Sequence, residues 1–192
     1  MRPILRVEVL PIAEYERVRP TFRGRIIESK KRRRFTLGDH MSGLFENRDS
    51  VHLQIQEMLR TESITNESAV NYEVDTYNEL VPGSDELSLT LFVEVPEKEM
   101  RERMLVELAG LEERIFAEVD GARFPFRGKR EGASDDRTTA VHYLKAKLSD
   151  DAARSLKQRR AKAAVVIDHP RYATRTDLSE DAHGALAEDL EG

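Results

Sequence analysis

The chain has 192 residues, of which 39% are hydrophobic and 35% charged, so it can form a core beneath a very polar surface. It contains no cysteine, which excludes disulfide bonds, a cysteine nucleophile and an iron–sulfur cluster held by the chain's own thiolates. No apolar run approaches the roughly 18 residues of a membrane span, and acidic residues occur too early for a signal peptide, so we expect a cytoplasmic protein without a membrane segment.

The net charge of −5 is distributed unevenly along the chain. Residues 1–34 carry eleven Lys and Arg against four acidic residues, whereas residues 35–100 carry three basic residues against fourteen acidic ones. Such a separation indicates that the two segments face each other or face different partners. The basic run at residues 30–34 ends a predicted helix, where cations suit the helix dipole. Few aromatic residues stand near it, so we do not expect nucleic-acid binding.

The first 83 residues are predicted to be mainly helical. Apolar residues recur at helical spacing over residues 12–34, and Pro20 predicts a kink or two short helices there. A brief strand is expected over residues 34–38. Two further helices should end near residues 62 and 80, and their short connection predicts an antiparallel hairpin. Their candidate N-caps are Asp49 or Ser50 for the first and Thr65 or Asn66 for the second.

Residues 84–192 are predicted to alternate between strands and helices. Strands are expected over residues 87–95, 114–119, 138–149 and 163–168, and helices over residues 97–109, 150–162 and 178–190. The order β-α-β-β-α-β before the last helix fits a ferredoxin-like unit. The predicted fold class is therefore α+β, with a helical N-terminal region at residues 1–83 and a ferredoxin-like antiparallel sheet packed with helices at residues 84–192.

Two glutamates fall on the apolar faces of the predicted hairpin helices. Glu62 lies between Ile55 and Met58 on the helical wheel, and Glu73 lies inside the apolar arc that includes Tyr77. A buried carboxylate needs a cation, a hydrogen-bond partner or a bound proton. Facing carboxylates on adjacent helices can bind iron or manganese.

A structural role is the alternative for both carboxylates. Glu62 stands at a helix end, where a small shift of the boundary would place it in solvent. Glu73 could accept a hydrogen bond from a tyrosine or pair with an arginine such as Arg60.

Two histidines extend the metal hypothesis. His142 shares the core-facing side of its predicted strand with Leu144, and His169 follows the end of another strand. A single such histidine is usually a structural core residue. Together with the two glutamates, however, they form a ligand set suited to iron, manganese or zinc. The sequence therefore predicts a metal site made of Glu62, Glu73, His142 and His169. Either Tyr77 or Glu57 could orient a ligand or move a proton there.

Several runs resemble a known bacterial family. The segments YERVRPTFRGRIIESKKRRRFTLG, LFENRDSVHLQIQEMLRTE and YNELVPGSDELSLTLFVEV are similar to the family known only as domain of unknown function 3501. TTAVHYLKAKL, DHPRY and the terminal EDL extend the resemblance over nearly the whole chain. The basic run is longer than the family pattern. The matched positions are Glu57, Glu62, Tyr77, Asn78, His142 and His169, with Glu73 matching less closely.

The resemblance implies a setting rather than an activity. Members of this family often occur beside genes for rubrerythrin-like proteins and iron–sulfur oxidoreductases. We therefore expect a non-haem metal-binding protein in redox or oxidative-stress metabolism, with a rubrerythrin-like protein or an iron–sulfur oxidoreductase as partner. The alternative is a non-catalytic accessory module that docks on an iron–sulfur oxidoreductase through its basic or acidic surface.

Overall fold

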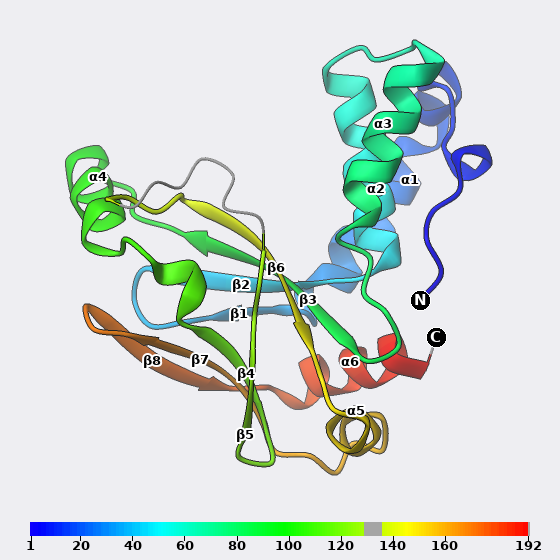
Figure 1. Ribbon diagram of the computed structural model, residues 1–192. Coiled ribbons are helices and arrows are strands. Elements are labelled where there is room, and N and C mark those ends of the chain that lie inside the picture. The colour runs from blue at the N-terminus through cyan, green and yellow to red at the C-terminus, as the bar shows by residue number, and fades with distance from the viewer. Residues whose placement is uncertain (129–135, 192) are drawn as a thin grey trace.

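The computed structural model describes residues 1–128 and 136–191, and it confirms the predicted α+β class. Figure 1 shows two β-sheets beside a bundle of three helices, α1 to α3. These helices are α1 (Ile12–Lys31), α2 (Arg48–Thr61) and α3 (Glu67–Asn78), preceded by the short 3-10 helix η1 (Arg6–Glu8). The remaining helices are α4 (Lys98–Glu107), η2 (Leu111–Glu113), α5 (Asp150–Lys157) and α6 (Glu180–Glu191).

The strands form two antiparallel sheets of four strands each. The first sheet has the order β1-β2-β3-β6, and the second has the order β5-β4-β7-β8. The first comprises β1 (Arg34–Thr36), β2 (Met41–Glu46), β3 (Glu86–Val93) and β6 (Val141–Lys147). The second comprises β4 (Ile115–Val119), β5 (Ala122–Pro125), β7 (Ala163–His169) and β8 (Tyr172–Asp177).

The strand pairing differs from the ferredoxin-like arrangement, which would place all four predicted strands in one sheet. Instead β3 pairs with β6 in the first sheet, while β4 pairs with β7 in the second. Three strands that the sequence did not reveal, β2, β5 and β8, complete the sheets. Every residue of β2 is buried, so this strand lacks the alternation of apolar and polar residues that identifies a half-buried strand.

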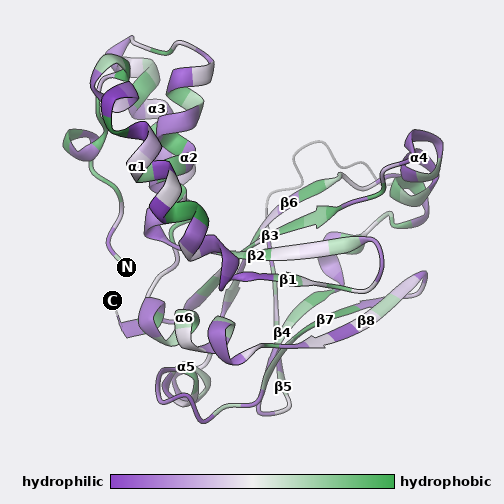
Figure 2. Ribbon diagram, turned by 180° about the vertical axis from the view of Figure 1, so that it is seen from behind, coloured by the Kyte–Doolittle hydropathy of each residue, from purple (hydrophilic) through white to green (hydrophobic). Residues whose placement is uncertain are grey.

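The two sheets enclose the main hydrophobic core. It includes Leu89 and Leu91 of β3, Ile115 of β4 and Phe126, all almost completely buried. Fully burying side chains of this size stabilises the fold by about 1.5–3 kcal/mol each. Figure 2 shows that β3 and β7 are largely hydrophobic, whereas α1 is mostly hydrophilic. None of the helices described combines the length and apolar character that a membrane crossing requires.

The sheets are joined at one edge by a short backbone bridge. The amide of Arg127 donates to the carbonyl of Lys145 at 2.8 Å, and the amide of Lys145 donates to the carbonyl of Arg127 at 2.7 Å. On the other side, the Thr176 hydroxyl donates to the carbonyl of Thr36 at 2.8 Å. The eight strands therefore surround the core as two connected layers.

The N-terminal helices only partly follow the sequence-based expectations. Helix α1 runs without a break through Pro20, so of the two expected alternatives, a kink or two short helices, the second is wrong. Helix α2 is capped by Asn47, whose side chain accepts from the amide of Ser50 at 2.9 Å, and not by Asp49 or Ser50. Asn66 caps α3 as predicted, and α2 packs against α3.

A buried carboxylate fixes α2 on the outer face of the first sheet. Glu46 of β2 accepts hydrogen bonds from the hydroxyl of Ser50 in α2 and from that of Thr90 in β3, the latter at 2.7 Å. Because α3 packs on α2, these contacts also position α3 beside the first sheet. The predicted boundary at residue 83 lies between α3 and β3. The first sheet takes strands from both sides of it, and the division into two regions stays a prediction.

Candidate functional site

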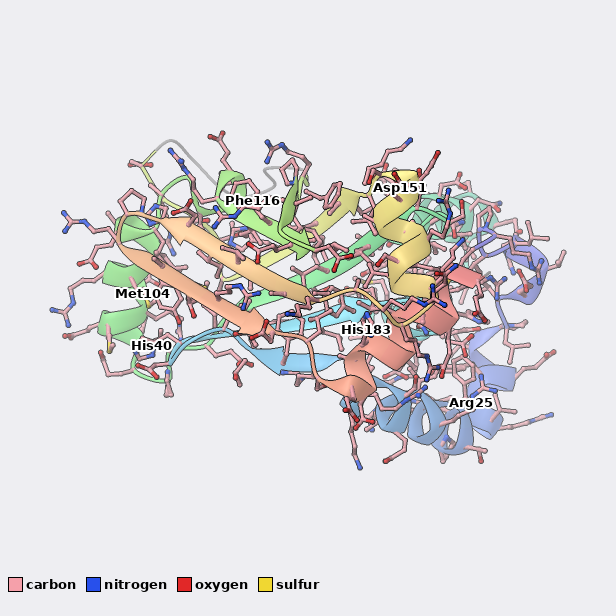
Figure 3. All side chains as sticks on the ribbon, turned by 90° about the horizontal axis from the view of Figure 1, so that it is seen from below. Arg25, His40, Met104, Phe116, Asp151 and His183 are labelled. Carbon is pink, nitrogen blue, oxygen red and sulfur yellow. The ribbon has the colours of Figure 1, made fainter. Side chains whose placement is uncertain are left out.

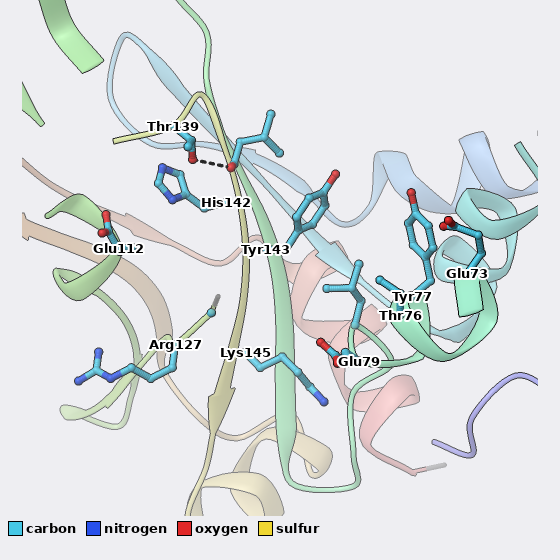
Figure 4. A pocket seen from close by; sticks show the side chains of 13 residues that line it. Glu73, Thr76, Tyr77, Glu79, Glu112, Arg127, Thr139, His142, Tyr143 and Lys145 are labelled. Carbon is cyan, nitrogen blue, oxygen red and sulfur yellow. Dashed lines mark hydrogen bonds between the residues drawn. The ribbon is translucent and has the colours of Figure 1, made fainter. Parts of the chain in front are cut away.

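A pocket of about 570 Å³ lies between α3 and β6, the outermost strand of the first sheet. We call it the β6 pocket. Figure 4 shows its lining side chains on both sides of β6, with Glu112 and His142 on one side and Tyr143, Tyr77 and Glu73 on the other. Its defining residues are Glu73, Tyr77, Glu112, Gly128, His142 and Tyr143.

A chain of three buried polar groups forms one wall of the β6 pocket. The Thr138 hydroxyl donates to Oε2 of Glu112 at 3.3 Å and lies 3.2 Å from Nε2 of His142. Thr138 is fully buried, and His142 and Glu112 are 6% and 8% exposed. Because the Thr138 proton points to Glu112, its oxygen accepts the Nε2 proton of His142. The three groups therefore form a directed hydrogen-bond chain from His142 to Glu112.

Burial controls the charge of His142. It lowers the pKa of the imidazole below its usual range, against the opposing effects of the Glu112 charge and a backbone hydrogen bond to Thr139. The imidazole is consequently neutral at pH 7 and can accept a proton. A neutral histidine held by a hydroxyl and a carboxylate is an arrangement suited to proton transfer.

The other wall carries a carboxylate and two aromatic rings. Figure 4 shows Tyr77 and Tyr143 pointing the same way, with Glu73 beside Tyr77. Burial raises the pKa of Tyr77, and smaller effects of Tyr143 and Glu73 act in the same direction. Within the described part of the chain, the half-buried Glu73 makes no hydrogen bond or ion pair. Its carboxylate is therefore free to meet a ligand.

The basic residues of the pocket leave this negative charge uncompensated. Lys145 Nζ lies 2.5 Å from a carboxylate oxygen of Glu86 and donates to the carbonyl of Val81 at 3.0 Å. The guanidinium group of Arg127 donates to the carbonyl of Phe126, and its side chain is directed away from the two tyrosines in Figure 4. The pocket is thus better suited to a positive charge or hydrogen-bond donor than to an anion.

A glycine permits the close approach of the two sheets beside the pocket. A Cβ atom on Gly128 would overlap the carbonyl oxygen of Tyr143 and come within 3.0 Å of a methyl group of Leu144. A backbone oxygen in a paired strand cannot move aside cheaply. Only glycine therefore allows this segment to reach β6 at the Arg127–Lys145 bridge.

The structure places two of the four predicted metal ligands at the β6 pocket and two elsewhere. Glu73 and His142 line the pocket, and His142 lies on the core side of its strand as predicted. Glu62 is the exposed C-cap residue of α2. Among residues 1–128 and 136–191, no group of three or more His, Asp or Glu side chains is positioned to hold a metal ion.

His169 lies near the end of α4, where backbone groups hold its ring. Its Nδ1 accepts from the amide of Arg171 at 3.2 Å, so Nε2 carries the proton and donates to the carbonyl of Ala109, also at 3.2 Å. Both ring nitrogens are therefore already engaged with backbone groups.

The two residues expected to assist the metal ligands also lie in different parts of the structure. Tyr77 lies in the β6 pocket. Glu57 joins α1 to α2 by accepting hydrogen bonds from the Tyr15 hydroxyl at 2.6 Å and from Arg19 Nε at 2.7 Å. Arg19 is the main reason that the pKa of Glu57 is lowered to about 2.

Several pocket residues gave no functional signal in the sequence. Glu112 stands just beyond a predicted helix, and Thr138 opens a predicted strand 26 residues later. Tyr143 and Lys145 could be placed on the outer face of β6 by alternation, but nothing local indicated that α3 would face them.

The structure defines an α+β protein in which two antiparallel sheets enclose a core and a ligand-sized pocket opens beside β6. A family model described as "Protein of unknown function (DUF3501)" matches residues 3–190, and the chain belongs to this family. The family resemblance expected from the sequence is thereby confirmed.

The fold also resembles a solved structure. A crystal structure of a novel protein of unknown function from Burkholderia pseudomallei K96243 has 33% sequence identity to this chain and a TM-score of 0.91. The match covers 98% of this chain and 100% of that one. Comparison with curated proteins finds no match.

Proposed function

We propose that the β6 pocket binds a small organic molecule bearing a positive charge or a hydrogen-bond donor, and that His142 exchanges a proton with it. The observation that carries this proposal is the buried His142–Thr138–Glu112 chain, which reaches a pocket large enough for a small ligand. A buried polar chain at a pocket wall is a recurring feature of acid–base sites.

The opposite wall supports the charge assigned to the ligand. The Glu73 carboxylate supplies a charged acceptor, and the rings of Tyr77 and Tyr143 supply faces over which a cation is attracted. His142 is neutral at pH 7, so it does not repel a cation and can take a proton from it. Thr138 and Glu112 act as positioning residues, because they fix the ring and stabilise its charged form.

Benzylammonium is a suitable probe of this pocket, with benzoate as the probe of opposite charge. We expect saturable binding of benzylammonium by isothermal titration calorimetry, and any binding of benzoate should be unaffected by substitution of Glu73. The Glu73→Gln variant should bind benzylammonium at least about tenfold more weakly, because it loses a charged hydrogen-bond acceptor. The matched control is Asp75→Asn, the same change of charge at an exposed position of α3 outside the pocket.

The pH dependence tests the role of His142. Burial lowers the pKa of His142, so the imidazole gains a proton only as the pH falls below the usual histidine range; that proton places a positive charge in the pocket, and binding of benzylammonium should weaken as it is taken up. The His142→Gln variant should lose this dependence. Absence of saturable benzylammonium binding would contradict the proposed function. An equal loss of affinity in Asp75→Asn, or an unchanged pH dependence in His142→Gln, would do the same.

A metal ion is the second candidate ligand, because Glu73 and His142 line the same pocket. Since the described residues offer no group of three such ligands, water or a bound molecule would complete the coordination of iron, manganese or zinc. Elemental analysis of untagged protein purified without chelator should then find about one equivalent of metal, lost in the Glu73→Ala/His142→Ala variant. Wild-type protein that stays metal-free after reconstitution with ferrous iron would exclude this candidate.

The remaining sequence-based expectations stay predictions: a redox role, a cytoplasmic location, and a rubrerythrin-like or iron–sulfur partner. The basic run that would dock on such a partner is partly used within the fold. Arg33 pairs with the buried Asp189, and Arg32 pairs with Glu188 at 3.0 Å. A docking complex would therefore depend on the other exposed charges and would weaken with added salt.

A further inference from the structure

A second pocket, of about 320 Å³, lies where α4 meets two strand turns. We call it the α4 pocket. Figure 3 shows His40 of the β1–β2 turn and Met104 of α4 at the same end of the molecule. The lining residues that matter for its chemistry are His40, Arg103, Met104, Leu108, Arg171 and Tyr172.

One wall of the α4 pocket is held by Tyr172. Its hydroxyl donates to the carbonyl of Leu37 at 2.5 Å and accepts from the amide of His40 at 3.2 Å. Gly38 permits this approach, because it has a φ of +68° and a Cβ atom there would overlap the tyrosine hydroxyl. The turn carrying His40 is therefore fixed against β8.

The opposite wall is fixed in a similar way. The amide of Arg171 donates to His169, which in turn donates to the carbonyl of Ala109 just after α4. These hydrogen bonds tie the β7–β8 turn to the end of α4. The backbone positions of Arg103 and Arg171 are thus set before any ligand binds.

Two arginine side chains of this pocket lack partners. Neither Arg103 nor Arg171 donates a side-chain hydrogen bond or forms an ion pair within residues 1–128 and 136–191. Arg103 acts on Glu97 only through longer-range charge, as a minor cause of the lowered pKa of that carboxylate. Glu107 is the one acidic residue among the lining residues described, so positive charge predominates.

The floor of the pocket is apolar. Leu108 is 1% exposed and belongs to the main core, and Met104 packs against that core. Arg103 and Arg171, both exposed, line the same pocket as this apolar floor, and such a lining suits a ligand with an anionic head and an apolar body. Arginine matches both carboxylate and phosphate oxygens through paired N–H groups.

We propose that the α4 pocket binds a small organic anion, with its carboxylate or phosphate head held by Arg103 and Arg171 and its apolar body resting on Met104, above the buried Leu108. The His40 ring lies at the rim as an additional hydrogen-bonding group. This site is separate from the β6 pocket, shares no lining residue with it and does not depend on the function proposed there.

Phenyl phosphate, benzoate and inorganic phosphate are the probes, compared by isothermal titration calorimetry at constant ionic strength. At least one of the two organic anions should bind saturably and more tightly than inorganic phosphate, because only these reach the apolar floor. The tighter of the two identifies the head group. The Arg103→Gln/Arg171→Gln variant should weaken this binding at least about tenfold, since two charged donors are lost.

The matched control is Arg23→Gln/Arg160→Gln, which removes the same charge from two exposed arginines outside the pocket. It should bind the probes as the wild type does, and both variants should keep the wild-type unfolding midpoint. An equal loss of affinity in the control would show nonspecific attraction and overturn the proposal. Failure of both organic anions to bind at millimolar concentration, or binding of inorganic phosphate as tight as theirs, would also overturn it.

Discussion

Replacing Arg33 with methionine is expected to lower the free energy of unfolding by about 3–5 kcal/mol, because it leaves the Asp189 carboxylate buried without a cation. Arg33 and Asp189 are 3% and 7% exposed, and two hydrogen bonds join them. Burial already raises the pKa of Asp189, while the Arg33 charge and hydrogen bonds oppose that rise. This pair connects the end of α1 to α6, so its loss should loosen the C-terminal helix.

Equilibrium unfolding in urea measures this effect, and two further variants test its cause. Arg33→Met/Asp189→Leu should recover a large part of the lost stability, because the double variant buries no unpaired charge. The control Arg32→Met removes the neighbouring, exposed ion pair with Glu188 and should cost no more than about 1 kcal/mol. Equal losses in Arg32→Met and Arg33→Met would contradict this account.

Replacing Gly128 with alanine is expected to destabilise the fold by about 2–4 kcal/mol and to weaken ligand binding in the β6 pocket. The added methyl group would overlap the carbonyl oxygen of Tyr143, so this segment would have to move away from β6. That movement would strain the backbone and break the two hydrogen bonds between Arg127 and Lys145. Urea unfolding and benzylammonium titration measure the two consequences.

The control for this prediction is Gly24→Ala in the exposed middle of α1. A Cβ atom at Gly24 meets nothing within 4 Å, and alanine is the better helix former by about 1 kcal/mol. Gly24→Ala should therefore stabilise the protein slightly and leave the pocket unchanged. If Gly128→Ala is as stable as the wild type and binds the probe normally, the close approach at Tyr143 does not shape the pocket.

Local signals in the sequence located most of the elements. Alternating apolar residues identified β3, β4 and β6, a short continuous apolar run identified β7, and helical periodicity with an Asn66 cap identified α3. The same alternation placed His142 on the core side of β6, where the structure finds it. These predictions succeed because each depends on residues only a few positions apart.

The candidate site was predicted less completely. Sequence periodicity shows which face of a helix or strand a residue occupies, but not which other element packs against that face. Glu73 and His142 were chosen as candidates because each is a polar residue on an apolar face, and both line the β6 pocket. Glu62 was selected by the same rule but sits exposed at a helix end. Glu57 was among the positions that match the family, but its structural role could not be predicted, because its partner Arg19 lies 38 residues away on another helix.

The sequence by itself determined the α+β class, the family and the core-facing side of each strong strand. Tertiary structure alone decided that the strands divide between two sheets, because pairing depends on β2, which is buried throughout, and on β5 and β8, which contain no fully buried residue. It alone also joined His142 to Glu112 through Thr138 and brought α3 over β6. Such contacts arise from how completed elements pack together, and that packing is not encoded in the spacing of any one segment.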